Sequence, residues 1–94
     1  MLTGKKLIRR SAIEARTIRA VAHPHRLAIL RLLNGTDMRL KELSMHTQTS
    51  QSLLLHHLAI LIENGLTGTY KGGARTFYRL EKKHLEEVKN TFSF

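Results

Sequence analysis

The stretch from Leu40 to Glu63 reads LKELSMHTQTSQSLLLHHLAILIE, and it decides the fold. It contains two runs with apolar residues at helical spacing, separated by the polar break Gln48-Thr49-Ser50. Ser50 directly precedes the second run, where a serine hydroxyl accepts a hydrogen bond from a free backbone N–H at the helix start. We therefore predict a short helix over residues 40–47, a tight turn, and a second helix over residues 51–63.

The second predicted helix has one apolar face and one polar face. The apolar face follows the spacing i, i+4, i+7, i+8 and should pack against the body, through Leu54, Leu58, Leu61 and Ile62. A short helix, a tight turn and a second helix form the helix-turn-helix unit, whose second helix enters the major groove of DNA. The opposite face and the turn before it then supply the candidate DNA-binding residues Thr49, Ser50, Gln51, Ser52, Leu55 and His56.

The chemistry of these candidates suits base edges and phosphates. Gln51 can pair with adenine in bidentate fashion, Ser52 can contact a base or a phosphate, and Leu55 can meet a thymine methyl group. The amides near Ser50 suit a phosphate. Two other interpretations stay open: Gln51 and Ser52 can simply be solvated, and Leu55 can pack against a neighbouring segment.

The flanking segments complete the order of elements. Pro24, the only proline, should end a helix over residues 11–22 and open the next, which Asn34-Gly35 closes. That second helix should bury Leu27, Leu30 and Leu33, with Ile29 and Leu32 beside them. After Asn64-Gly65, two arms of strand formers surround Gly72-Gly73, which is a hairpin signal. A last helix is predicted over residues 81–91.

These elements predict a mainly α fold with a small β-hairpin: a winged helix-turn-helix with about five helices and a two-stranded wing, as a single domain over residues 1–94. Lys71 and Arg75 flank the tip of the wing, where they can bind DNA or merely protect a sheet edge. Residues 1–10 carry four basic side chains and are expected to form a flexible basic tail, with contact to the minor groove as the alternative.

The composition supports a nucleic-acid partner. Sixteen Lys and Arg against seven Asp and Glu give a formal charge of +9, which favours nucleic acid over a membrane surface as the partner. The absence of cysteine excludes disulfides, thiolate metal sites and thiol redox sensing. No stretch reads as a signal peptide or a membrane span, so we expect a cytoplasmic protein. No paired carboxylates or phosphate-binding glycine loop appear, so an enzyme is not expected.

Three motifs together resemble the ArsR/SmtB family of winged-helix repressors. They are VAHPHRLAILRLL from Val21, SQSLLLHHLAILIENGL from Ser50 and YKGGARTFYRL from Tyr70. The resemblance implies a homodimer, held by the first and last helices, that binds an inverted repeat near a promoter and usually represses. Leu55 and His56 depart from the family pattern, which more often has serine and a basic residue there. His57 matches a family histidine and is expected to be structural.

The resemblance also directs attention to dimerisation and metal sensing. Apolar stripes in the first and last helices predict a dimer interface of Ile13, Ile18, Val21, Leu85, Val88 and Phe92. Ser44 and His46 stand at the two cysteine positions of one family metal site. In the other, His84 matches but Lys82 replaces an aspartate. His23 and His25 can meet another histidine in space, yet no ligand spacing supports this. We therefore predict no metal site and no cofactor, and the inducer is unknown.

The leading hypothesis is sequence-specific duplex binding by a homodimeric repressor. A winged-helix module for protein or RNA interaction is the first alternative, favoured by the outward position of Leu55. A metal-responsive repressor with a non-standard histidine site is the second.

Overall fold

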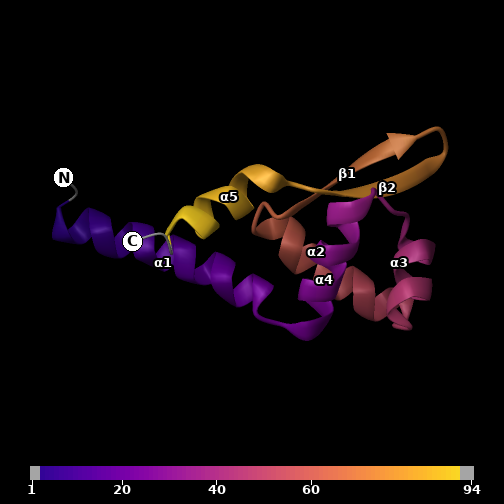
Figure 1. Cartoon of the computed structure of the whole chain (residues 1–94), viewed down its shortest axis with the longest axis horizontal. Helices are drawn as coiled ribbons and strands as arrows, with labels where there is room; N and C mark the ends of the chain where they lie inside the picture. Colours follow the sequence, from indigo (N-terminus) through magenta and orange to yellow (C-terminus); the bar gives the residue numbers. More distant parts are fainter. Residues whose placement is uncertain (1–2, 92–94) are drawn as a thin grey trace.

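The computed structural model describes residues 3–91, and the side chains of residues 3–86. It contains five helices and one two-stranded antiparallel hairpin, which confirms the winged helix-turn-helix fold (Figure 1). The elements in chain order are α1 (Gly4–Val21), α2 (Pro24–Gly35), α3 (Leu40–Thr47), α4 (Gln51–Glu63), β1 (Thr67–Gly72), β2 (Arg75–Leu80) and α5 (Lys82–Thr91). No helix among these residues is long and apolar enough to cross a membrane.

The hydrophobic core lies between α2, α3 and α4, and Leu66 and Tyr78 close it on the side of the hairpin. The predicted face of α4 is buried through Leu54, Leu58 and Leu61. Ile62 does not belong to this face, because its side chain is 43% exposed. Four residues advance an α-helix by about 40° past a full turn, so Ile62 is rotated from Leu58 to the edge of the stripe. In α2, Leu30 and Leu33 are buried as predicted, whereas Leu27 and Leu32 are half-buried.

Helix α1 begins at Gly4 rather than at residue 11, so most of the expected tail is helical. Thr3 caps the helix, since its hydroxyl accepts a hydrogen bond from the Lys6 backbone N–H at 3.3 Å. No proline or further glycine interrupts the chain before Pro24, and the helix therefore extends back to this cap. Figure 1 shows α1 reaching away from the core, with α5 beside it and the wing at the opposite end.

The wing turns at Gly73-Ala74, one residue later than predicted, because Gly72 pairs with Arg75 in the ladder. Gly73 has a φ of +66°, the conformation that glycine adopts at the first position of a type II′ turn. Gly72 is required for another reason: a Cβ there would lie 2.7 Å from the ring of Phe77. At its base the wing is bonded to Met38, whose N–H and C=O both pair with Tyr78.

Candidate nucleic-acid interface

The turn between α3 and α4 is held by side chains as well as backbone. Gln48 adopts a left-handed conformation with φ 52°, which reverses the chain after α3. The Ser44 hydroxyl donates to the Thr49 carbonyl at 2.6 Å, and the Thr49 hydroxyl donates to the Thr47 carbonyl at 3.1 Å. Thr49 is therefore buried within the turn and sets its shape, rather than projecting like the other predicted contact residues.

The first turns of α4 present their polar face to solvent. Ser50 caps the helix as predicted, and its hydroxyl accepts from the Leu53 N–H at 3.3 Å. Gln51 and Ser52 are exposed, and neither side chain makes a hydrogen bond with any other described residue. Their donors and acceptors are thus free to meet a ligand. The structure brings together on this one surface Ser50, Gln51, Ser52, Leu55 and His56.

The same end of α4 also exposes apolar surface. The Leu55 side chain is 47% exposed, so it does not pack under a neighbouring segment of this chain. Leu53, which the sequence analysis did not single out, is exposed on another side of the helix. Leu53 was hard to assign from the sequence, because three consecutive leucines fit several helical faces equally well.

The wing carries its cations near the tip. Lys71 and Arg75 are both exposed, and the Lys71 ammonium donates to the Thr76 hydroxyl at 2.7 Å. Behind them, the Tyr70 hydroxyl donates to an Asp37 carboxylate oxygen at 2.7 Å, and this bond raises the pKa of Tyr70. The Tyr70–Asp37 bond ties the wing to the segment before α3. It was not predicted, because nothing local in the sequence links residues 33 positions apart.

The predicted dimer residues of α1 vary in exposure. Ile13 is 52% exposed, whereas Ile18 and Val21 are half-buried within this chain. Two further apolar side chains, Leu7 and Ile8, are exposed on the part of α1 that was expected to be a tail. Helix α1 contacts α5, where the Thr17 hydroxyl lies 3.1 Å from His84 Nε2. Leu85 is half-buried, the Val88 side chain lies outside the described part of the structure, and so does Phe92.

Three histidines converge where α2 begins against α4. One potential ligand atom from each of His23, His25 and His57 lies within 4.8 Å of the other two. Burial lowers the pKa of His57, and the positive charges of the neighbouring His23, His25 and Arg26 lower it further. The pKa of His23 is lowered in the same way. The sequence allowed for such a meeting but gave no ligand spacing that predicts it.

Comparison with known proteins places this geometry in a family. The model of the family described as "Bacterial regulatory protein, arsR family" matches residues 23–67. The chain is 34% identical over 71 residues to the arsenical resistance operon repressor of Staphylococcus xylosus, which covers 76% of this chain and 68% of that protein. It is 31% identical over 72 residues to the transcriptional repressor SdpR of Bacillus subtilis, over 77% of this chain and 80% of SdpR.

Solved structures agree with the sequence matches. Reduced HlyU from Vibrio cholerae superposes with a TM-score of 0.78 at 34% identity, over 93% of this chain and 88% of HlyU. The transcriptional repressor BigR from Xylella fastidiosa gives a TM-score of 0.80 at 26% identity, over 97% and 91% of the two chains. The chain therefore belongs to the arsR family of bacterial regulatory proteins, which are DNA-binding winged helix-turn-helix regulators of transcription.

Proposed function

We propose that this chain is a homodimeric repressor that recognises an inverted repeat in duplex DNA by its sequence. The observation that carries the proposal is the state of Gln51 and Ser52: both are exposed and unbonded at the start of α4, directly after a turn fixed by its own hydrogen bonds. The N-terminal residues of a recognition helix are the ones that reach base edges in this class of domain.

Each exposed residue of α4 has a role suited to its chemistry. Gln51 pairs with the edge of an adenine, and Ser52 bonds a base or a phosphate. Leu55 supplies an apolar contact for a thymine methyl group. The free amides that follow Ser50 receive a phosphate at the helix N-terminus. Thr49 takes no contact of its own in this proposal, since its hydroxyl is used to hold the turn.

The wing and the net charge supply affinity that does not depend on sequence. Lys71 and Arg75 stand exposed near the wing tip, where they neutralise phosphates beside the major-groove contact. The formal charge of +9 adds long-range attraction to the duplex. Phosphate contacts of this kind fix the position of the domain, while the α4 contacts choose the sequence.

In this proposal, a second copy of the chain forms a two-fold symmetric dimer that matches the symmetry of the inverted repeat. Ile13 and Ile8 expose apolar surface on α1, and α5 lies beside that helix. Pairing of these helices about a two-fold axis buries this surface. It places the two copies of α4 about one DNA turn, or ~34 Å, apart.

The proposal is tested by selecting bound sequences from random duplex DNA with the full chain. We expect enrichment of a two-fold symmetric site with half-sites about one helical turn apart. Enrichment of no duplex sequence contradicts the proposal.

A winged-helix module for RNA or protein is the second candidate, because Leu53 and Leu55 give the exposed end of α4 an apolar character. Displacement of bound duplex by single-stranded RNA at equal concentration favours that candidate.

A further inference from the structure

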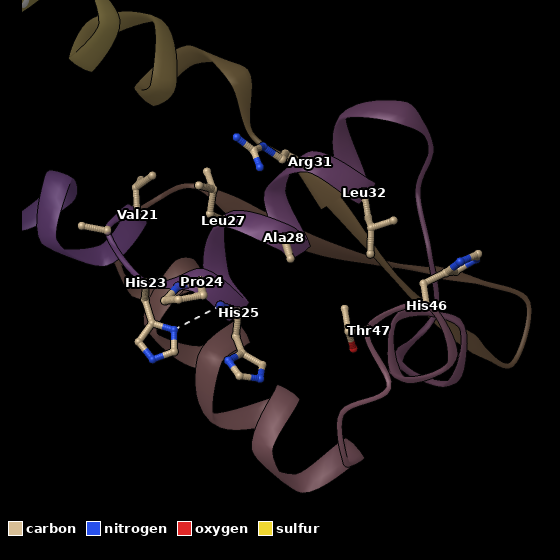
Figure 2. A pocket seen from close by; sticks show the side chains of 11 residues that line it. Val21, His23, Pro24, His25, Leu27, Ala28, Arg31, Leu32, His46 and Thr47 are labelled. Carbon is tan, nitrogen blue, oxygen red and sulfur yellow. Dashed lines mark hydrogen bonds between the residues drawn. The ribbon is translucent and has the colours of Figure 1, made fainter.

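The histidine cluster joins two elements that the fold places against each other. His23 is the N-cap of α2, His25 lies in its first turn, and His57 lies on the buried side of α4. The His25 and His57 rings are stacked at 5.2 Å between centroids, and the His23 and His57 rings are 4.5 Å apart. Figure 2 shows His23 and His25 on the same side of the first turn of α2.

One ring nitrogen in the cluster is buried and has no hydrogen-bond partner among the described residues. The His57 side chain is 5% exposed, and its Nδ1 has no hydrogen-bond partner among the described residues. Buried polar atoms in proteins nearly always have a partner, so an unpaired buried nitrogen on a ring that lies beside two other imidazoles points to a ligand. The predicted structural role of His57 explains why the ring is buried but not why its nitrogen is unpaired.

Three imidazole nitrogens form a donor set for a transition metal. Imidazole suits zinc, copper and nickel, and sites with three protein ligands leave a fourth position for water or an anion. Nitrogens at about 2.0–2.1 Å from Zn²⁺ in a tetrahedron are ~3.4 Å apart, so the rings need to close by at most ~1.4 Å from their present separation. We propose that His23, His25 and His57 bind one divalent first-row transition-metal ion per chain, with Zn²⁺ as the reference ion.

The surroundings of the cluster give an ion access from solvent and favour the neutral form of the rings that would bind it. His23 and His25 line an open cavity of about 790 Å³ between α2 and α3, through which an ion reaches the rings from solvent. A ring must be neutral to bind a metal, and the lowered pKa values of His23 and His57 favour the neutral form of both rings.

Two features limit the affinity of this site. The guanidinium of Arg26 is close enough to oppose a cation electrostatically. His23 Nδ1 already accepts a hydrogen bond from the His25 backbone N–H at 3.2 Å, and metal binding through this ring breaks that bond. Either Nδ1 itself binds the ion, or the proton on Nε2 moves to Nδ1 and Nε2 binds it. We therefore expect weaker binding than at a structural zinc site.

The position of the site connects it to regulation, a consequence that rests on the proposed function. An ion held by His57 and by the α2 histidines fixes α4 relative to α2. The exposed His56 directly precedes His57 on α4. A ligand that changes the freedom of this helix changes operator affinity, and DNA then changes metal affinity by the same factor.

Zn²⁺ titration of the tag-free, chelator-treated full chain by calorimetry tests the site without DNA. We expect one Zn²⁺ per chain and an affinity at least about tenfold weaker in His25→Gln, since even an outer-shell partner is worth roughly 10–100-fold. His46→Gln is the matched control, because His46 is exposed and lines the same cavity but lies outside the cluster. His23→Asn is a second test that keeps an N-cap residue while removing the ring. Equal Zn²⁺ affinity in His25→Gln, His46→Gln and the parent chain, or no binding to the parent chain, overturns the site.

Operator titration with and without Zn²⁺ tests the regulatory part. We expect the affinity of the parent chain for a selected duplex to change about fivefold or more, and that of His25→Gln to remain constant. One bound Zn²⁺ with no effect on the operator overturns the regulation and leaves the site standing. Failure to select any duplex overturns the proposed function, while the calorimetric result still decides the metal site.

Discussion

The hydroxyl of Ser44 donates a 2.6 Å hydrogen bond to the backbone carbonyl of Thr49, across the turn that joins α3 to α4. Thr49 in turn uses its own hydroxyl to bond the Thr47 carbonyl. The position of Ser44, where the family resemblance places a cysteine in some metal sensors, therefore has a structural use in this chain. The bond fixes the angle at which α4 leaves the turn.

Loss of this bond should cost stability. Ser44→Ala leaves the carbonyl of the buried Thr49 without its side-chain donor, and we expect a loss of about 1 kcal/mol in the free energy of unfolding. For a domain of this size that corresponds to a decrease of roughly 4–8 °C in Tm, measured by circular dichroism. Ser52→Ala is the matched control, since Ser52 is exposed and unbonded; an equal decrease in both variants contradicts the role of Ser44.

The wing cations should affect the salt dependence of binding. With roughly 6–10 phosphates neutralised, operator affinity should fall about 10³–10⁵-fold between 50 and 200 mM salt. Lys71→Gln with Arg75→Gln removes two contacts in each chain, so the slope of log affinity against log salt should decrease by about four in a dimer. Fluorescence anisotropy measures this slope. An unchanged slope in the double variant means that the wing does not touch phosphates.

Glu42 should contribute to the acid limit of stability. Its carboxylate accepts from the Arg39 backbone N–H and side chain, both at 3.1 Å, and these bonds lower its pKa. The bonds therefore stabilise the fold at neutral pH, and this contribution is lost as the pH falls through the lowered pKa. Denaturant unfolding from pH 7 to pH 3 should show a smaller stability loss for Glu42→Gln than for the parent chain. Equal losses of stability in Glu42→Gln and in the parent chain over this pH range contradict the role of Glu42.

Dimerisation should depend on α1. Ile8 is 72% exposed and Ile13 is 52% exposed. A buried charge in place of either should oppose association, and we expect Ile13→Glu to weaken the dimer by at least tenfold in sedimentation equilibrium, because an unpaired buried charge is costly. Met45→Glu is the control, since Met45 is an exposed apolar residue on α3, away from α1. A monomeric parent chain, or equal weakening in both variants, contradicts the interface.

The elements with strong local signals could be predicted from the sequence. Ser50 followed by periodic leucines defines α4 from Gln51 to Glu63, because capping and amphipathic spacing are both local. The predicted start of α1 was too late in the chain, because the four basic side chains within residues 5–10 fit either a solvated tail or a helix. The cap at Thr3 shows that this stretch begins the helix. The wing turn was predicted one residue too early, because a glycine can serve either purpose found here. Gly72 allows the close approach of the Phe77 ring, and Gly73 takes the positive φ of the turn.

The parts of the site that depend on distant pairs could not be predicted. Tyr70 and Asp37 meet only because Tyr78 pairs with Met38 and sets the wing beside the segment before α3. His57 joins His23 and His25 through the packing of α4 on α2, which the family histidine pattern does not specify. Sequence spacing identifies ligands on one element, whereas the histidine cluster is formed across two.

The exposed start of α4 is expected to read base edges, and substitution of Gln51 gives the sharpest test of this readout. The measurement is the affinity of the parent chain and of Gln51→Ala for the selected operator and for every single base-pair variant of it. We expect Gln51→Ala to lose about 1–3 kcal/mol of discrimination at one base pair in each half-site and to retain it elsewhere. A uniform loss of affinity across all variants, with the base preferences unchanged, contradicts the claim, because Gln51 would then contact only the backbone.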